Sequence, residues 1–461
     1  MARTQPTSPR RSPLWRHHDF MQLWMGDTVS VFGSQLVLFA LPLIAVQVLH
    51  ADAFEMGLLA ALESAAFLLI SLPAGAWVDR LPKKAVIVAG DIIRAAILLT
   101  IPVTWAFDAL TMIQLYLVAA GVGIVTVFFD IANQSFLPEI VEAESIGDGN
   151  GKLQASQQTA RVAGPTLASG LVTILGAPLT VGLTSICMGL SSLFVSRIRY
   201  RPTSAEVAHR RGFLAEIREG LGFVLAHPLL RRMTACTGLA NLASSAIFGL
   251  FALYILRTLS LSQTQMGIIM SVGAAGGILG ALTASHVQRL LGEGRSVAVT
   301  AVLNGVFFFS MPLASVLPAM PTLIIGWFAL TWSVVVYNIA QVSFRQRLCP
   351  KPLLGRMNAS IRFLVWGPMP IGALAGGILG DQFGVATTMW IFAAWATLAS
   401  LPVVISPLLM MRTLPRELDL LSGKAQSSDN TASRENSDIR PEDGDVRPED
   451  GDVPPVTGPR T

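Results

Sequence analysis

The chain has 461 residues, of which 52% are hydrophobic and only 13% are charged, and its mean hydropathy is +0.57. This composition excludes an ordinary soluble domain, in which about a quarter of the residues are charged. The formal net charge is +4 at pH 7. Because the basic residues gather in loops between apolar runs, the charge does not indicate a nucleic-acid partner.

Apolar runs long enough to cross a bilayer follow one another along the chain. A helix needs about 20 apolar residues to span hydrocarbon, and its backbone polar groups must bond within the segment. The sequence therefore predicts an all-α membrane protein with twelve transmembrane helices. The predicted helices are 20–49, 54–78, 85–106, 109–132, 153–176, 178–198, 233–256, 265–289, 296–316, 320–342, 357–380 and 384–411.

Lysine and arginine favour the cytosolic side of a membrane. Arg257 is the one basic residue in a predicted loop on one side, and the opposite loops are basic. We therefore expect a multi-pass cell-membrane protein with both termini cytosolic. Residues 1–19 are predicted to be an uncleaved cytosolic tail, because the apolar stretch behind them is too long for a signal peptide.

Two breaks in hydropathy divide the chain. Residues 199–232 are basic and contain apolar residues at helical spacing, which indicates a cytosolic linker with an amphipathic helix. Residues 412–461 are polar, and the heptapeptide at 440–446 is repeated at 447–453. Such a stretch buries too little apolar area to fold, so a disordered cytosolic tail is expected.

The two halves, 20–198 and 233–411, carry related motifs. The sequence GKLQAS at 151–156 is matched by GRMNAS at 355–360, and each precedes a glycine-proline pair, Gly164-Pro165 and Gly367-Pro368. Two pseudo-symmetric six-helix bundles are therefore expected. Parallel repeats of this kind place a binding site near the midplane between the halves.

A set of short motifs resembles the major facilitator superfamily, in the branch that holds bacterial macrolide-efflux and enterobactin-export proteins. The motifs are Gly75-x-x-x-Asp79-Arg80 with Lys83-Lys84, Asp91-Ile-Ile-Arg94, Leu137-Pro138-Glu139, Gly164-Pro165 and Leu354-Gly355-Arg356-x-Asn358-Ala359. The resemblance covers about residues 14 to 418. It implies transport by alternating access, with a gate on the cytosolic side.

The cytosolic gate is expected at the first two of these motifs. Asp79 and Arg80 could latch this side shut through a helix terminus and a carboxylate, although the basic residues also satisfy the positive-inside rule. Asp91 and Arg94 are three apart on one helix face and can form an ion pair. The predicted gate residues are Gly75, Asp79, Arg80, Lys83, Lys84, Asp91 and Arg94. Arg161 and Arg362 are expected either to snorkel to the cytosolic interface or to receive the carboxylates Asp130 and Glu139 as gate partners.

Gly164-Pro165 resembles the antiporter signature of the fifth helix, although Ala168 and Ser169 replace two of its usual glycines. The fourth helix lacks the arginine of many proton antiporters, so export is better supported than a proton route. Asp27 and Glu63 are the proton-coupling candidates, because a carboxyl group is costly inside a membrane helix. A structural hydrogen bond is the alternative for Asp27.

The seventh and tenth helices line the cavity in the resembled family. The substrate-binding candidates are Ser34, Asn241, Phe248, Trp332, Tyr337 and Asn338. Their mixture of aromatic and amide groups suits a bulky amphipathic or cationic molecule. Helix packing is the alternative for each of them.

The sequence contains no convincing ATP loop, metal-ligand spacing or nucleophile elbow, so neither an enzyme nor a cofactor or metal is expected. We expect a monomeric secondary exporter of a drug or natural product, coupled to protons. Siderophore export is one alternative. A transporter-like sensor or scaffold, whose tail recruits a cytosolic partner, is the other.

Overall fold

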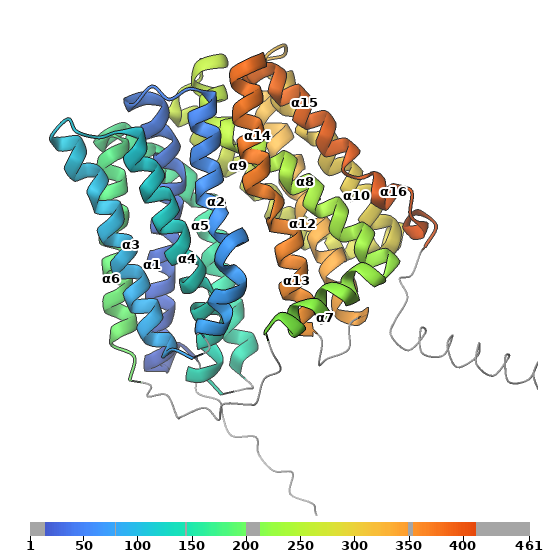
Figure 1. Ribbon diagram of the computed structural model, residues 1–461, viewed down its shortest axis with the longest axis horizontal. Coiled ribbons are helices and arrows are strands. Elements are labelled where there is room, and N and C mark those ends of the chain that lie inside the picture. Colours follow the sequence, from blue (N-terminus) through green and yellow to red (C-terminus); the bar gives the residue numbers. More distant parts are fainter. Residues whose placement is uncertain (1–13, 79, 143–144, 200–212, 349–353, 412–461) are drawn as a thin grey trace, which may run out of the picture. The chain divides into compact units, whose positions relative to one another are not determined.

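The computed structural model describes residues 14–78, 80–142, 145–199, 213–348 and 354–411. Within these residues every regular element is a helix (Figure 1). The elements of the first half are η1 (Leu14–Arg16), α1 (His18–Leu43), η2 (Ile44–Val48), α2 (Ala53–Val78), α3 (Lys83–Ala106), α4 (Met112–Ile140), α5 (Ile146–Leu175) and α6 (Ala177–Ser196).

Helix α7 (Phe213–Ala226) lies in the predicted linker and precedes the second half. The remaining elements are α8 (Pro228–Leu253), η4 (Tyr254–Thr258), α9 (Gln263–Leu291), α10 (Glu293–Phe308), α11 (Ser310–Leu313), α12 (Ala319–Leu348), α13 (Leu354–Trp366), α14 (Pro368–Phe383), α15 (Val385–Leu398), α16 (Leu401–Val404) and η6 (Pro407–Leu409).

Among the described residues, eleven helical segments are long and apolar enough to cross a membrane. The predicted fifth helix, α5, is absent from these eleven because polar residues such as Gln154, Gln158 and Arg161 interrupt its apolar character. At 30 residues, however, α5 is long enough to span hydrocarbon. With α5 included, the predicted set of twelve spanning helices is accounted for.

Several helices extend beyond their predicted bounds. Helix α5 begins at Ile146, seven residues before the predicted start, because the glycine-rich stretch 147–151 continues the helix instead of forming a loop. This extension places Arg161 in the middle of α5. The predicted eleventh helix is divided into α13 and α14 at Gly367, which precedes Pro368.

Matching irregularities recur in the two halves. Helices α1 and α8 each end in a five-residue π-helical segment, η2 and η4. Each segment is followed by a residue in the left-handed region, His50 with φ 56° and Ser260 with φ 53°. Gly176 and Gly384, with φ 85° and 83°, join α5 to α6 and α14 to α15. The duplicated motifs therefore correspond to duplicated structure.

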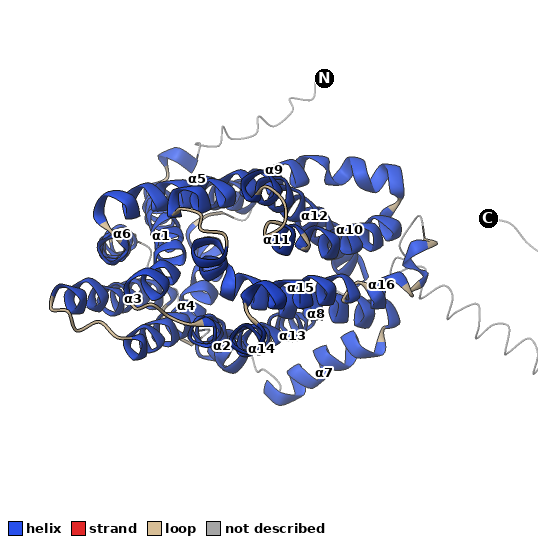
Figure 2. Ribbon diagram, turned by 90° about the horizontal axis from the view of Figure 1, so that it is seen from above, coloured by secondary structure: helices blue, strands red, loops and turns tan. Residues whose placement is uncertain are grey.

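The helical bundle has two ends. Val48 lies at one, called the Val48 end, and Lys83 lies at the other, called the Lys83 end. Helix α2 packs against α14, and α5 packs against α9 (Figure 2). A Cβ atom built on Gly57 of α2 would lie 2.5 Å from the Cα atom of Gly377, and one built on Gly267 of α9 would lie 2.9 Å from the carbonyl oxygen of Pro165. These close backbone contacts join the halves toward the Val48 end.

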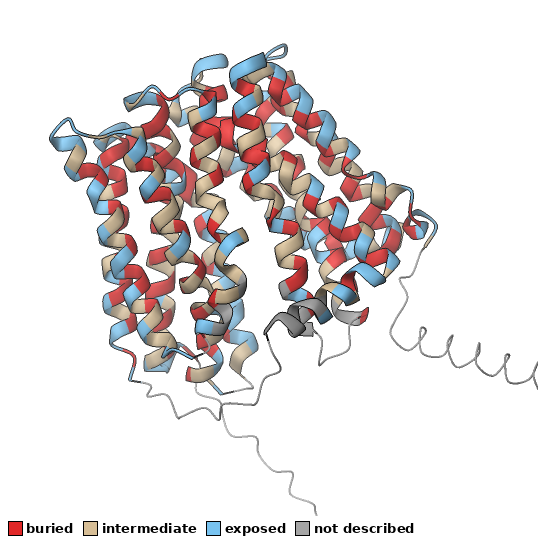
Figure 3. Cartoon of the chain, in the orientation of Figure 1, coloured by how far each residue is buried: buried red, intermediate tan, exposed pale blue. Residues whose placement is uncertain are grey.

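Many large apolar side chains are exposed. Figure 3 shows exposed residues along the outer helices. Ile113, Leu117 and Ile174 are 70%, 70% and 80% exposed. Such exposure would be unfavourable in water, and it is expected where helices face lipid tails. Buried side chains lie where helices face one another.

Candidate transport site

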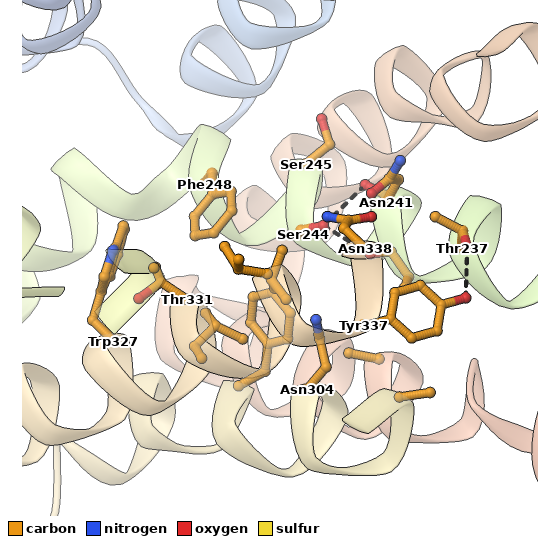
Figure 4. A pocket seen from close by; sticks show the side chains of 18 of the residues that line it. Thr237, Asn241, Ser244, Ser245, Phe248, Asn304, Trp327, Thr331, Tyr337 and Asn338 are labelled. Carbon is orange, nitrogen blue, oxygen red and sulfur yellow. Dashed lines mark hydrogen bonds between the residues drawn. The ribbon is translucent and has the colours of Figure 1, made fainter. Parts of the chain in front are cut away.

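A cavity of about 450 Å³ lies among α8, α9, α10, α12, α14 and α15 of the second half, with two side chains of α5 from the first half. Its lining is mixed (Figure 4). Phe248 and Trp327 lie at one end with the Thr331 hydroxyl group beside them, and Thr237, Asn241 and the Tyr337 ring lie toward the other. Small-molecule sites in proteins commonly have this size and this mixture of surfaces.

The aromatic end is built by Phe248 of α8, Phe308 of α10 and Trp327 of α12. The ring centroid of Phe248 lies 5.3 Å from that of Trp327 and 5.9 Å from that of Phe308. The ring centroid of Phe251, one turn along α8, lies 4.6 Å from that of Trp327, and the two rings are tilted by 51°. The tilted contacts fix the rings as one apolar wall.

The polar part is held by hydrogen bonds between helices and within α12. The hydroxyl groups of Thr237 and Tyr337 are 2.8 Å apart and connect α8 to α12 (Figure 4). The Asn241 amide donates to the carbonyl oxygen of Val365 over 2.9 Å. Asn338 accepts a hydrogen bond of 2.9 Å from Gln341. The amide groups are therefore oriented by their neighbours before any substrate arrives.

Four predicted substrate-binding residues, Asn241, Phe248, Tyr337 and Asn338, line this cavity. Trp332 and Ser34 do not. The Trp332 indole N–H donates to Thr283 of α9 over 2.9 Å, and the Ser34 hydroxyl donates to the Ser30 carbonyl oxygen over 2.9 Å. These two side chains are engaged in contacts within and between helices.

Trp327 and Thr331 line the cavity but were missed by the sequence analysis. Residues 327, 331, 334 and 338 of α12 follow the spacing i, i+4, i+7, i+11. Residues 237, 241, 244 and 248 of α8 follow the same spacing, and all eight line the cavity. The helical period could therefore have located Trp327, whereas the aromatic content of α12 alone favoured Trp332.

Arg161 is the only charged residue among the described residues that line the cavity, and Gln158 lies beside it one turn earlier on α5. Its side chain is exposed, and it forms no ion pair with any residue in the described segments. Arg161 was predicted to be a gate partner or to snorkel to the interface, and these roles stay predictions. The structure adds that Arg161 lines the cavity.

A second cluster of polar side chains lies inside the first half. Asp27 of α1 is only 3% exposed, and its Oδ1 atom accepts a 2.7 Å hydrogen bond from the Asn133 amide of α4. Its Oδ2 atom has no hydrogen-bond partner among the described residues. Asn133 was not identified from the sequence, because its role depends on a contact between residues 106 apart.

Asp91 and Arg94 form the predicted ion pair on α3, and both are buried. The Arg94 guanidinium also lies 3.9 Å from the ring centroid of Phe129. Ser30 of α1 donates to Asp91 over 3.4 Å. The pair thus connects α3 to α1 and α4.

Arg362 of α13 and Asp130 of α4 come from different halves and lie within electrostatic range of each other. The Arg362 guanidinium also stacks over Trp366 and Phe67, at 4.7 and 5.9 Å from their ring centroids. The structure therefore brings together one of the predicted pairs of gate partners across the two halves.

The described part of the gate motif contacts its own half. Lys83 forms an ion pair with Glu139 of α4, and Lys84 donates to the carbonyl oxygen of Ile198 over 2.6 Å. Arg80 is exposed. Asp79 lies outside the described residues, as does the local packing of Gly75, so the predicted latch stays a prediction.

Glu63 lies half-buried on α2, between Ala60 and Phe67 along one helix face. Ala60 lies 3.1 Å from the position of a Cβ atom built on Gly249 of α8, and Phe67 contacts Trp366 of α13. Glu63 therefore lies on the face of α2 that meets the second half.

Gly164 and Pro165 lie in α5 where it packs against both halves. A Cβ atom on Gly164 would lie 2.5 Å from the Cβ atom of Gln35 on α1. The adjacent Thr166 donates through its hydroxyl group to Ser271 of α9 over 2.7 Å. The motif thus permits close packing on one side and a polar contact between the halves on the other. The described residues contain no cluster of side chains suited to a metal ion.

The apolar helices and the cavity are those of a multi-pass membrane protein with room for a small molecule. The chain matches the sequence profile of the Major Facilitator Superfamily over residues 23–367 and belongs to that family. It is 26% identical over 412 residues to the multidrug efflux pump Tap of Mycolicibacterium fortuitum, covering 85% of this chain and 94% of that protein. It is 22% identical over 394 residues to the enterobactin exporter EntS of Salmonella choleraesuis, covering 85% and 90%.

Solved structures share the fold at low sequence identity. A bacterial homologue of the iron transporter ferroportin in an inward-facing state has a TM-score of 0.71 and 17% identity, covering 86% of this chain and 99% of that one. The nucleoside transporter NupG, also with a TM-score of 0.71, is 14% identical and covers 84% and 98%. These structures agree with the predicted all-helical transporter fold.

Proposed function

We propose that this protein is a secondary active exporter of an amphipathic drug or natural product, which works by alternating access. The observation that carries the proposal is the cavity of mixed character between α5 and the second half. The similarity to a multidrug efflux pump and to an enterobactin exporter supports export of a small organic molecule.

The proposed orientation has both termini in the cytosol, so that the Val48 end faces outward. The close contacts at Gly57 and Gly267 then close the outer side. Substrate would enter the cavity from the cytosol or inner leaflet and leave after these contacts separate. Rocking of two repeated bundles about a midplane site is the motion that this arrangement permits.

Asp27 is the proposed proton-coupling residue. Of the carboxylates near it, Asp91 is paired with Arg94, and Asp130 lies near both Arg94 and Arg362. Asp27 has only the neutral amide of Asn133 as a partner. An ionised carboxylate buried without a cation is costly, so proton uptake at Asp27 would favour one conformation and release would favour the other. Glu63 is the second candidate.

The test is transport in energised inverted membrane vesicles that contain the full chain. Lipophilic antibiotics and siderophores are offered with and without a protonophore. We expect accumulation that collapses when the protonophore is added. Accumulation that survives the protonophore would contradict proton coupling, and absence of flux for every compound would contradict export.

Siderophore export is the second candidate function, and the similarity to an enterobactin exporter favours it. It predicts that deletion of the gene traps siderophore inside cells and that iron starvation raises expression. Preferential accumulation of antibiotics over siderophores in the same vesicles would argue against it.

A further inference from the structure

We propose that the cavity binds an acidic group of its substrate at Arg161, so that the transported molecule is an aromatic acid or another anion with an aromatic portion. This inference rests on the proposed function, which assigns substrate binding to the cavity. It names the chemical class of the substrate and the residue that selects it.

Arg161 lies within α5 and not at either end of the helix. It is fifteen residues after Ile146, and together with Gln158 it lines the cavity that α5 shares with the second half. A charged side chain within a membrane helix is costly, and it commonly faces the bundle interior or a water-filled cavity and marks a substrate pathway.

Arg161 also differs from the other intramembrane arginines in its surroundings. Arg94 is neutralised by Asp91, and Arg362 stacks on two aromatic rings near Asp130. Arg161 has no ion-pair partner in the described segments, and its side chain is exposed to the cavity. We therefore expect a bound ligand to supply the negative charge that balances the Arg161 guanidinium group.

The charge of the cavity selects the sign of the ligand. No carboxylate is present among the described lining residues, so Arg161 sets the local potential. Aromatic rings alone would suit a cation, as the sequence analysis expected. A cation bound beside Phe248 and Trp327 would, however, be repelled by the unpaired guanidinium group of Arg161 in the same cavity. The tertiary structure therefore favours an anion.

Other polar side chains of the cavity are suited to an acidic ligand. Gln158 lies one turn from Arg161 on the same face of α5, and Asn241 and Asn338 line the same cavity from α8 and α12. A planar guanidinium group can donate two parallel hydrogen bonds to a carboxylate. The rings of Phe248 and Trp327 would hold the apolar portion of the same molecule.

The test measures equilibrium binding to the purified full chain in lipid nanodiscs. Three ligands share one aromatic skeleton and differ in charge: 2-naphthoate, 2-naphthamide and 2-naphthylmethylammonium. We expect naphthoate to bind at least about tenfold more tightly than the other two. Because these three ligands are compared on the unmodified protein, the result does not depend on any variant folding correctly.

Variants then assign the preference to Arg161. Arg161→Gln should remove the preference for the acid, whereas Arg161→Lys should keep part of it, because the charge remains and the paired hydrogen-bond geometry is lost. Arg289→Gln is the matched control, since Arg289 is exposed at the end of α9 and does not line the cavity. It should leave all three affinities unchanged.

The inference would be overturned if the amide or the amine bound as tightly as the acid, if none of the three bound, or if the preference survived Arg161→Gln. Failure of the proposed function is separable from these results. Acid binding at Arg161 without flux in energised vesicles would leave the site in place and remove the exporter. Flux of cationic drugs that Arg161→Gln leaves unchanged would support the exporter and remove the acid-binding role of Arg161.

Discussion

Gly57 of α2 and Gly377 of α14 bring the two halves into backbone contact, because a Cβ atom on Gly57 would lie 2.5 Å from the Cα atom of Gly377. We expect Gly57→Ala to force these helices apart. Overpacking of this kind costs about 1–3 kcal/mol, enough to shift a two-state equilibrium by roughly fivefold or more toward separation at the Val48 end. Spin-label distances across this end should lengthen, and transport should fall.

Gly189→Ala on α6 is the matched control, because nothing lies within 4 Å of the Cβ position there. It should change neither the distances nor the flux. Unchanged distances in Gly57→Ala protein would show that the contact does not restrain the two halves.

Gly273 of α9 supports the aromatic end of the cavity without being one of its lining residues. An added Cβ atom would lie 1.9 Å from the Cδ1 atom of Trp327. Gly273→Ala should therefore displace the indole ring and weaken binding of an aromatic substrate about tenfold, as measured by calorimetry. Gly170→Ala, which has open space around its Cβ position, should bind normally. Equal affinity in both variants would place the substrate elsewhere.

Asp27→Asn should separate substrate exchange from uphill transport. The amide resembles a permanently protonated acid, so substrate can still bind and exchange while proton-driven accumulation falls to the level seen with a protonophore. Counterflow and accumulation are measured in the same vesicles. Undiminished accumulation would transfer the proposed role to Glu63, and loss of membrane insertion would instead identify Asp27 as structural.

Deletion of residues 425–461 should leave transport within about twofold of the full chain, because a polar, repetitive tail contributes little to a packed membrane core. Vesicle flux at equal protein abundance is the measurement. Flux that disappears in correctly inserted protein would support the alternative in which the tail recruits a cytosolic partner.

The sequence alone determined the membrane-spanning character, the helical class and the duplication. These properties follow from local physics: a run of about 20 apolar residues must be helical in hydrocarbon, and the motifs at 151–156 and 355–360 repeat in the printed sequence. The Asp91–Arg94 pair was likewise predictable, because residues three apart share a helix face.

Only the tertiary structure decided which polar groups meet. The Asp27–Asn133 hydrogen bond joins two helices whose relative rotation is set by packing across the whole first half. Whether Arg161 meets the cavity depended on how α5 packs against the second half, which the sequence does not show. Helical periodicity shows which residues share a face, but the contacts between helices determine whether that face meets lipid, another helix or the cavity.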